Sequence, residues 1–542
     1  MFLDLFALAR VCLLLAASLL LGCGGGGASS AGPEAPLPAF DTSAIAKADP
    51  GSSLPADWTS GVFMEIYVRG YKDSDGDGIG DLRGLTQSLD YLKDLGVSGI
   101  WLMPVNTSQD HDHGYAVTDY RGIETQYGSL ADFDELLAQA HARGIGVIID
   151  YVMNHSAAQH PAFVNARAAA DNPYRDWYVW QANRPSGWNI YGSDPWHQGG
   201  TGYYFAGFWD QMPDFNLLNP DVIAYHHDSM RFWLNRGVDG FRFDAVGNLV
   251  ENGPAAWEKQ PQNYTLMNEV RQLLAGYSQR YLVCEAPADP IGFTAASACG
   301  SAFAFGHNTD IVNAARGHTG AIQAVASYFA SAPASLATMV SNHDAFAGQR
   351  LHDQLGGNLA QMRLAAATYL LQPGTPFIYY GEEIGMAGAA SLGGDHKLRT
   401  PMSWTGNTSN AGFTSGTPFR ALSGNAATHN VAAQAGDANS LHGFYKTMIA
   451  LRRDWPSLAR GSYEAAAASG GVMSFQRRLG AERTVVVINY GTSAASASVS
   501  NLPAGAQLAA LHPTPGDDVA ASAGGVAGIA MAAQSVKVFR VR

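Results

Sequence analysis

Three carboxylic acids each lie at or near the end of a short, mostly apolar run of the chain. Asp244 lies in "GFRFDAV", Glu285 in "YLVCEAP" and Asp344 in "LATMVSNHD". Two such groups can cleave a glycosidic bond, because one attacks the anomeric carbon as an anion while the other donates a proton to the leaving oxygen. The residue types therefore predict glycoside hydrolysis.

Arg242 and Asp244 lie two residues apart on one expected strand, so their side chains point to the same side. Taken alone, a structural ion pair would explain them about as well as a catalytic one. In a catalytic site the guanidinium would keep Asp244 ionised, as a nucleophile requires. Burial and the neighbouring anion of Asp344 would raise the pKa of Glu285 above its reference value of about 4.3, as a proton donor requires.

The elements that must position these groups alternate along the chain. From about residue 61, short β-branched runs alternate with amphipathic stretches such as "LADFDELLAQAHARG", which predicts an α/β fold with eight βα units, a (β/α)8 TIM barrel. The expected strands cover residues 61–68, 99–105, 146–153, 238–246, 281–287, 301–305, 336–344 and 376–384.

Catalytic groups of such barrels lie at the carboxyl ends of the strands. Polar residues gather at that end of four expected strands, and they are Asp150, Asn154, His155, Arg242, Asp244, Glu285, Asn342, His343 and Asp344. Because polar residues recur at the same end of four expected strands, a purely structural role for the Arg242–Asp244 pair is a poor explanation.

Composition suggests further domains. Residues 155–218 are rich in Trp, Tyr, Gly and Pro and are too long for a loop, which predicts a small domain inserted after the third strand. From about residue 460 the chain is rich in Ala, Gly, Ser and Val with short strand patterns, which predicts an all-β domain. The expected boundaries are 1–22 for a signal peptide, 23–57 for a flexible tether, 58–154 and 219–458 for the barrel, 155–218 for the insertion and 459–542 for the C-terminal domain.

Five segments resemble, in order and spacing, the signature regions of the α-amylase family, glycoside hydrolase family 13. They are "DYVMNH" (150–155), "MPDFN" (212–216), "GFRFDAV" (240–246), "CEAP" (284–287) and "SNHD" (341–344). The resemblance extends from about residue 61 to the C-terminus. It implies a (β/α)8 barrel with an inserted B domain, a C-terminal β-sandwich and retaining cleavage of α-glucosidic bonds.

The same resemblance implies a role for each candidate residue. Asp244 would be the nucleophile, Glu285 the acid/base, and Asp344 the third carboxylate, which binds sugar hydroxyls and helps keep Glu285 protonated. Substrate would be bound by Asp112, Tyr115, His155, Arg242 and His343.

Finer specificity is less strongly indicated. "MPDFN" resembles the intermediate group between α-amylases and oligo-1,6-glucosidase-like members, and Ala245 after the nucleophile favours α-1,4 linkages. "DHGY" (112–115) instead resembles a glucosidase segment, and Pro287 stands where the family commonly has Trp. We expect an α-amylase acting on starch or malto-oligosaccharides, with an α-glucosidase or transglycosylase as the alternative. A non-catalytic glucan-binding relative is a distant alternative, because such relatives typically lose carboxylates that this chain retains.

The segment "DSDGDGIGD" (73–81) alternates acidic side chains with glycines, as an oxygen-ligated Ca²⁺ loop requires. It resembles both an EF-hand loop and the first-loop calcium site of oligo-1,6-glucosidase-like members, but an EF-hand would need a Glu at its twelfth position and two flanking helices. The expected ligands are Asp73, Asp75, Asp77, the Ile79 carbonyl and Asp81. A solvated acidic turn is the alternative, and the family's second calcium site is doubtful because "DAVGNL" lacks the usual Lys-His.

The N-terminus reads as a processing signal. An apolar run after Arg10, too short to span a bilayer, ends in "LLGC", which resembles a lipoprotein lipobox and would make Cys23 the lipidated residue. We therefore expect an exported protein, lipid-anchored in the cell envelope, with an outer-membrane location favoured by Gly24. A net charge of −13 argues against nucleic acid or anionic lipid as a partner. We expect a monomer, and Cys284 and Cys299 could form a disulfide or remain two buried thiols.

Overall fold

The computed structural model of the protein describes residues 37–542, so the expected signal peptide and Cys23 lie outside the described residues. Seven parallel strands form one sheet in the order β10-β9-β5-β2-β1-β12-β11. Their bounds are β1 Phe63–Ile66, β2 Gly99–Leu102, β5 Gly146–Tyr151, β9 Gly240–Phe243, β10 Tyr281–Cys284, β11 Ala337–Thr338 and β12 Thr375–Tyr379.

The sheet closes through the segment expected to be the sixth strand. Ala302 forms a parallel bridge to Cys284 of β10, and Phe303 forms another to Ala337 of β11. The expected strand over 301–305 is therefore reduced to two bridges, because the chain turns at Gly306, with φ of +89°, directly into a helix. With this link, eight segments surround one barrel interior, as the sequence predicts.

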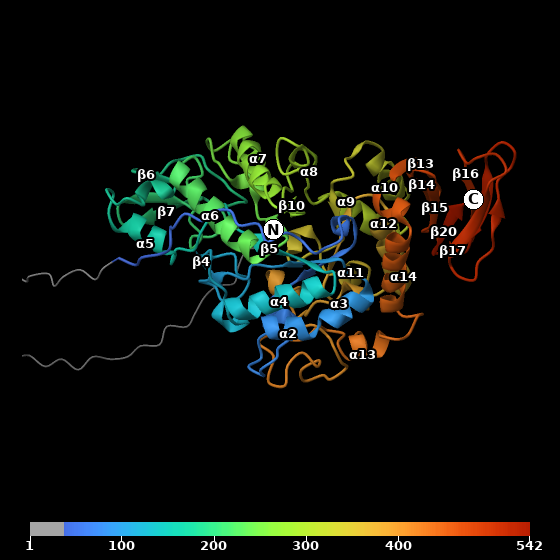
Figure 1. Cartoon of the computed structure of the whole chain (residues 1–542), viewed down its shortest axis with the longest axis horizontal. Helices are drawn as coiled ribbons and strands as arrows, with labels where there is room; N and C mark the ends of the chain where they lie inside the picture. The colour runs from blue at the N-terminus through green and yellow to red at the C-terminus, as the bar shows by residue number, and fades with distance from the viewer. Residues whose placement is uncertain (1–36) are drawn as a thin grey trace, which may run out of the picture. The chain divides into compact units, whose positions relative to one another are not determined.

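An outer layer of helices surrounds the strands (Figure 1). Their bounds are α2 Leu82–Gln87, α3 Leu89–Leu95, α4 Leu130–Ala142, α6 Pro220–Arg236, α7 Pro261–Ala275, α9 His307–Ala315, α10 Thr319–Ser331, α12 Leu359–Leu371 and α14 Leu441–Asp454. Local sequence sets these ends: Asn219 caps α6 before Pro220, and Gly237 ends it with φ of +107°. Across residues 37–542, no helix combines the length and apolarity that crossing a bilayer requires.

The shorter helices and strands lie in the connections. They are α1 Val68–Tyr71, β3 Thr107–Ser108, β4 Val117–Asp119, α8 Pro290–Phe293, α11 Leu351–Gln354, α13 Val431–Gln434 and α15 Pro456–Arg460.

The barrel interior is an apolar layer with a polar layer above it. Phe63, Ile148 and Val283 are fully buried in one cluster with Trp101 and Phe377. Because side chains alternate along a strand, the next inward-facing residue on three of these strands lies two positions later. That position holds Glu65, Asp150 and Glu285, respectively. Strand periodicity therefore places three carboxyl groups at the carboxyl end of a packed barrel.

The inserted domain follows β5 and precedes α6. It contains α5 (Pro161–Ala168) and a three-stranded antiparallel sheet in the order β6-β8-β7. The strands are β6 Trp180–Gln181, β7 Trp196–Gly199 and β8 Gly202–Phe205. Its small core is aromatic, with Trp196 and Phe205 packed edge to face at 5.3 Å.

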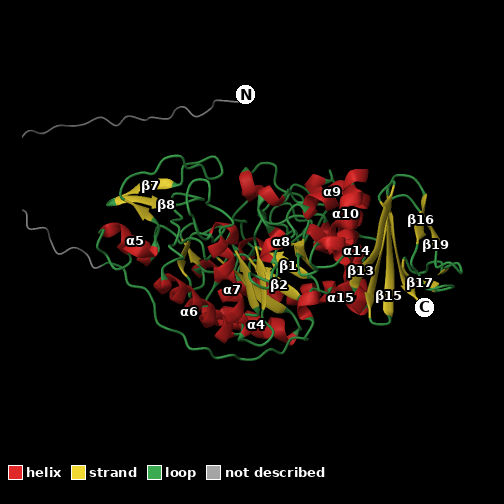
Figure 2. Cartoon of the chain, turned by 90° about the horizontal axis from the view of Figure 1, so that it is seen from above, coloured by secondary structure: helices red, strands yellow, loops and turns green. Residues whose placement is uncertain are grey.

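The C-terminal domain is built from antiparallel strands (Figure 2). A six-stranded sheet has the order β13-β14-β15-β20-β17-β18, and β16 pairs with β19 in a second sheet. The strands are β13 Ser462–Ser469, β14 Val472–Leu479, β15 Glu482–Asn489, β16 Ala495–Val499, β17 Gln507–His512, β18 Val519–Ala520, β19 Ala527–Met531 and β20 Ser535–Val541. Val485 and Val487 of one sheet are buried with Ile529 of the other, while Val486 and Ile488 join the barrel-side core. Alternate residues of β15 thus hold the two sheets together and fix the domain to the barrel helices.

The segment expected to be a flexible tether is packed against the barrel over its described second half. The ring of Phe40 lies 5.1–5.8 Å from the rings of His160, Tyr174, Trp177 and Tyr225. Further along, Ile45 donates its backbone N–H to Asp228, and Ala48 donates its own to Asn235. The composition of this segment suggested flexibility, but one aromatic residue and successive backbone hydrogen bonds hold residues 38–57 in place.

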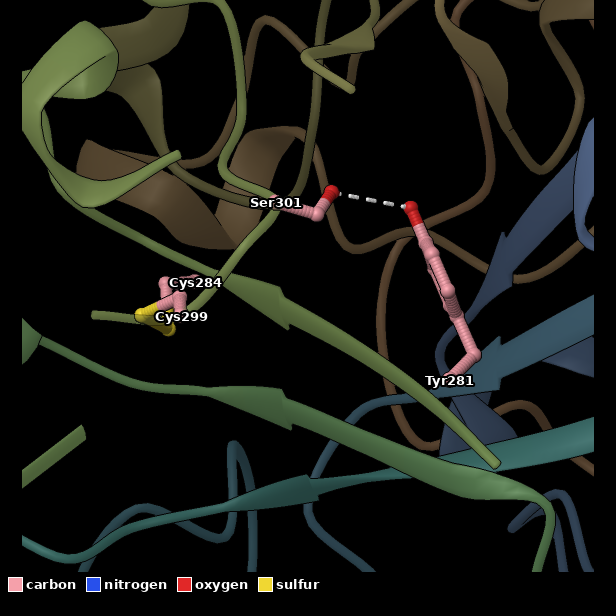
Figure 3. The surroundings of a disulfide bond; sticks show 4 residues. All are labelled: Tyr281, Cys284, Cys299 and Ser301. Carbon is pink, nitrogen blue, oxygen red and sulfur yellow. Dashed lines mark hydrogen bonds between the residues drawn. A yellow bond between two sulfur atoms is a disulfide. The ribbon is translucent and has the colours of Figure 1, made fainter. Parts of the chain in front are cut away.

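Cys284 and Cys299 form a disulfide, which resolves the alternatives left open by the sequence (Figure 3). Cys284 is the last residue of β10, directly before Glu285. Near the bond, Tyr281 and Ser301 share a hydrogen bond of 3.2 Å between their hydroxyl groups (Figure 3). The disulfide therefore closes a loop whose first residue after the strand is the expected acid/base.

We expect this disulfide to stabilise the fold, because it closes a loop with a sequence separation of 15 residues. A loop of that length restricts the unfolded chain enough to contribute about 3 kcal/mol. The Cys284→Ala, Cys299→Ala double variant should lose roughly that free energy of unfolding in a urea titration. Wild-type protein kept in dithiothreitol is the matched control, and equal stability of oxidised and reduced protein would contradict the prediction.

Candidate active site

Arg242 is the centre of the polar layer at the barrel mouth, and it is 1% exposed. Its Nη1 donates to Asp244 Oδ1 at 2.8 Å and to Asp150 at 2.8 and 2.9 Å, while its Nη2 lies 2.7 Å from Glu285 Oε2. One guanidinium group therefore binds three carboxylates from three neighbouring strands, β5, β9 and the end of β10.

A glycine allows strands β9 and β10 to approach each other closely. Gly240 has a φ of +148°, and a side chain there would place Cβ 1.8 Å from the backbone oxygen of Tyr281. Only glycine allows this approach of β9 and β10, which set the positions of Asp244 and Glu285.

Asp344 is held by a separate set of cations. His343 Nε2 lies 3.0 Å from Asp344 Oδ2, and Arg399 Nη2 lies 2.7 Å from Asp344 Oδ1. The other ring nitrogen of His343 contacts Glu65 at 2.5 Å, and Tyr115 OH lies 2.7 Å from His343 Nε2. His343 therefore lies between Glu65 and Asp344 and orients the carboxylate of Asp344.

The carboxyl groups of Asp244, Glu285 and Asp344 face one cavity of about 610 Å³. Its wall is formed by His113, Tyr115, His155, Tyr191, Phe208, Met212, Asp244, Ala245, Asn248, Glu285, Pro287, Asp344, Phe346, Asp395 and Arg399. His155 Nε2 is buried with no hydrogen-bond partner among the described residues. Burial lowers the pKa of His155 to about 3, so this neutral ring is available to a ligand hydroxyl.

The surroundings of Asp244, Glu285 and Asp344 shift the pKa of each carboxyl group differently. Burial raises the pKa of Glu285 to about 7, and the anions of Asp244 and Asp344 act in the same direction against Arg242. Burial also raises the pKa of Asp344, but His343 and Arg399 outweigh it and hold that pKa below its usual range. The pKa of Glu285 is therefore raised and that of Asp344 lowered, which suits a proton donor beside a permanent anion.

Arg242 lowers the pKa of Asp244, but other effects outweigh it. Burial raises the pKa of Asp244 to about 6, and the anions of Asp150 and Asp344 add to burial, although Arg242 opposes them. The sequence places one cation beside one anion, whereas in the structure the guanidinium of Arg242 is shared among three carboxylates.

Asp112 lies beside this cavity without lining it. Arg420 Nη2 donates to both of its carboxylate oxygens at 2.7 Å, and His396 Nδ1 lies 3.2 Å away. Its chain neighbour His113 does line the cavity. Asp112 is thus fixed on the side of the site that also holds Asp344 and Arg399.

The acidic loop lies apart from this site, ahead of α2. One carboxylate oxygen from each of Asp73, Asp75 and Asp81 lies within 4.8 Å of the others. Asp73 Oδ1 accepts from the backbone of Asp75 and Gly76, and Asp81 caps α2 through Gly84. The structure does not bring Asp77 into this group. Its carboxylate accepts the N–H of Ile79 at 2.7 Å.

Several site residues were not predicted from the sequence. Glu65 is an acid within the apolar run "FMEI" at the end of β1, which is the same signal that identified Asp150 and Glu285. Arg399 and Arg420 lie in the irregular segment between β12 and α14, where no periodic pattern indicates which side chains face the site.

Comparison with known proteins gives a family. The family model named "Alpha amylase, catalytic domain" matches residues 65–461. "Alpha-amylase 3" of Dictyoglomus thermophilum is 33% identical over 445 residues, which cover 80% of this chain and 85% of that protein. "Oligo-1,6-glucosidase" of Parageobacillus thermoglucosidasius is 31% identical, covering 80% and 90%. "Trehalose synthase/amylase TreS" of Mycolicibacterium smegmatis is 33% identical, covering 76% and 79%.

Solved structures agree with this result. A single-residue mutant of the trehalulose synthase MutB, in complex with Tris, superposes with a TM-score of 0.76 at 28% identity, covering 89% of this chain and 99% of that one. The α-glucosyl transfer enzyme XgtA has a TM-score of 0.77 at 28% identity, covering 90% and 99%. The match over most of the barrel, together with the carboxyl groups at its mouth, shows that this chain is a member of the α-amylase family of glycoside hydrolases.

Proposed function

We propose that the chain is a retaining α-glucan hydrolase, an α-amylase that cleaves α-1,4-glucosidic bonds of starch or malto-oligosaccharides. The observation that carries this proposal is the placement of Asp244 and Glu285 on two nitrogens of one guanidinium group, facing one cavity with Asp344. The motif "MPDFN" and the relative named α-amylase support the intermediate group of the family.

In the proposed reaction Asp244 attacks the anomeric carbon while Glu285 donates its proton to the glycosidic oxygen. The bond to that oxygen breaks, and a glucosyl ester of Asp244 forms. Glu285, now an anion, takes a proton from water as the water oxygen attacks the anomeric carbon and displaces Asp244. Two displacements leave the anomeric configuration unchanged.

The shared guanidinium supports retention over inversion. Retaining enzymes keep their two carboxyl groups about 5–5.5 Å apart, whereas inverting enzymes leave roughly 6.5–9.5 Å for a water molecule. Arg242 bonds Asp244 at 2.8 Å and Glu285 at 2.7 Å, which keeps the two groups near each other.

A second candidate, an α-glucosidase or transglycosylase acting at chain ends, is favoured by one observation. Arg420 and His396 hold Asp112 beside the cavity wall, where a fixed carboxylate could bind the last sugar of a chain. The relatives and solved structures include glucosidase and glucosyl-transfer enzymes by name.

The experiment that separates the two candidates uses maltoheptaose in which the non-reducing end is blocked by a ketal. An α-amylase cleaves the interior bonds of this substrate and releases short oligosaccharides. An enzyme that requires a free chain end leaves it intact while still cleaving unblocked maltoheptaose. Products longer than the unblocked substrate would identify transfer.

We expect a narrow bell-shaped pH profile of kcat/KM. Activity falls below the pKa of Asp244, about 6, because the nucleophile becomes protonated. Activity also falls above the pKa of Glu285, about 7, because the general acid loses its proton. Initial rates on maltoheptaose between pH 4 and 9 measure both limbs, and an optimum below pH 5 would contradict the assignment.

We propose that the acidic loop binds one Ca²⁺ ion, with Asp73, Asp75 and Asp81 as its carboxylate ligands. Calcium takes six to eight oxygen ligands at about 2.3–2.6 Å, which carboxylate oxygens spaced within 4.8 Å can supply. The carbonyl of Ile79 remains a proposed ligand, and Asp77 would have to move its carboxylate toward the other three to join. The ion would fix the connection from β1 to α2.

Calcium should therefore stabilise the fold, by about 2.7 kcal/mol at a concentration one hundred times its Kd. Thermal unfolding in EDTA should show a lower midpoint than in CaCl₂, and the Asp73→Asn variant should lose this difference. Asp171→Asn removes an exposed acid elsewhere and should respond like wild type. Equal midpoints of the wild type in both buffers would rule out the site.

We further propose that the protein is exported, lipidated at Cys23, anchored in the cell envelope facing outward or toward the periplasm, and monomeric. The lipobox-like "LLGC" supports this location. Labelling with a fatty-acid analogue in a bacterial host should mark the wild type and leave Cys23→Ser unlabelled.

A further inference from the structure

A second cavity, of about 260 Å³, adjoins the one that holds the three carboxyl groups. The two cavities share Tyr191, Asn248 and Pro287 in their walls. The rest of the second wall includes Glu258 and the chain directly after Glu285. The two cavities are therefore adjacent, with Tyr191 at their junction, and together they are called the track.

The chemistry of Glu285 shows which part of a substrate this track would hold. A general acid protonates the oxygen of the leaving group, so the leaving sugar lies on the side of the acid. The residues that follow Glu285, from Ala286 to Asp289, line the second cavity. That cavity is therefore on the leaving-group side of the cleaved bond.

Tyr191 is presented to the track by a tight turn of the inserted domain. Ile190 and Ser193 exchange two backbone hydrogen bonds of 2.8 and 2.9 Å across it, and Asn189 Oδ1 accepts the N–H of Gly192. Tyr191 has a φ of +48° and is 65% exposed. A bulky residue in the left-handed region is unfavourable, and such strain is concentrated at functional sites.

Neighbouring side chains hold the exposed ring in place. The ring of Trp257 packs edge-on at 5.1 Å, and the ring of Phe208 lies 6.0 Å away. Asn248 Nδ2, four residues after Asp244, donates to the Tyr191 hydroxyl at 3.5 Å. A solvent-exposed aromatic ring that is fixed on several sides can pack against the apolar face of a pyranose with little loss of conformational freedom.

We propose that Tyr191 determines specificity by binding the leaving-group glucose residues of an α-glucan, so that substrates with at least two glucose units beyond the cleaved bond are preferred. This inference deepens the proposed hydrolase function and depends on it. Trp257 and Phe208 hold the ring, and the second cavity accepts the continuing chain.

The test compares two substrates with different kinds of leaving group, an oligosaccharide and a fluoride ion. Cleavage of maltohexaose releases a shorter malto-oligosaccharide as the leaving group, whereas α-maltosyl fluoride releases fluoride and places no sugar in the second cavity. Tyr191→Ala should lower kcat/KM on maltohexaose about tenfold or more, and it should change fluoride release less than about twofold. Tyr191→Phe keeps the ring and should stay close to wild type on both substrates.

Trp209→Ala provides the matched control, because Trp209 is also an exposed aromatic residue of the inserted domain and lines neither of the two cavities. Unchanged maltohexaose cleavage in Tyr191→Ala would overturn the proposal, and so would equal losses on both substrates, which would place Tyr191 at the reacting centre instead. A wild-type enzyme that is inert on both substrates would refute the hydrolase function itself, and the proposal would fall with it.

Discussion

Replacing Asp244 by asparagine will lower kcat on α-glucans roughly ten-thousand-fold or more, because an amide cannot form the glycosyl ester. The substitution keeps the shape of the side chain, and its amide oxygen can still accept from Arg242, which binds Asp244 at 2.8 Å. The loss should therefore appear in activity and not in the unfolding midpoint. Initial rates on maltoheptaose, together with a thermal melt of the same sample, measure both quantities.

Asp239→Asn is the control for this variant. Asp239 is buried at the opposite end of the same strand, where it binds His141 and the N–H of Val147. Its loss should lower stability while kcat, measured well below the unfolding midpoint, stays near wild type. Comparable inactivation by both substitutions would mean that strand β9 is disrupted, and the assignment of Asp244 as nucleophile would lose its support.

Replacing Glu285 by alanine should have an effect that depends on the leaving group. General acid catalysis contributes roughly a hundredfold to ten-thousandfold, so cleavage of maltoheptaose should fall by that factor. Fluoride is a good leaving group and needs no proton, so the first step on α-maltosyl fluoride should be nearly unaffected. The second step should then be slow, because the base that activates water is absent.

Added azide distinguishes this explanation from a general loss of structure. A small anion that fits where Glu285 stood attacks the glycosyl ester without base catalysis, so azide should accelerate turnover of the fluoride and yield the α-glycosyl azide. A β-glycosyl azide would instead show direct displacement without the ester. No azide product and no fluoride release would contradict the role of Glu285.

Much of the site was predictable from the sequence, because the alternation of side chains along a strand determines which residues face the barrel interior. Residues two apart on a strand share a face, so an apolar residue followed two positions later by an acid, as in Ile148 and Asp150 or Val283 and Glu285, places that acid above the barrel core. Asp112, by contrast, is fixed by Arg420, which lies 308 positions away in the sequence. No local pattern indicates such a pairing, because tertiary packing alone creates it.

The failures have equally local causes. The composition that suggested a flexible tether gave no weight to Phe40, whose ring packs against four aromatic neighbours and, with backbone hydrogen bonds, holds residues 38–57 in place. The upward shift in the pKa of Asp244 could not be predicted from the sequence, because burial and the sharing of Arg242 with Asp150 and Glu285 become visible only once the strands are assembled.

The most direct test of the mechanism is to find the covalent intermediate. Glu285→Ala mixed with α-maltosyl fluoride should accumulate the glycosyl ester, because its formation is spared and its hydrolysis is slowed. Peptide mass spectrometry of the quenched protein should then find one maltosyl group on the peptide that contains Asp244. Fragmentation of that peptide should place the group on the Asp244 carboxylate. A maltosyl group on Asp344, or steady release of fluoride with no adduct at all, would contradict the account.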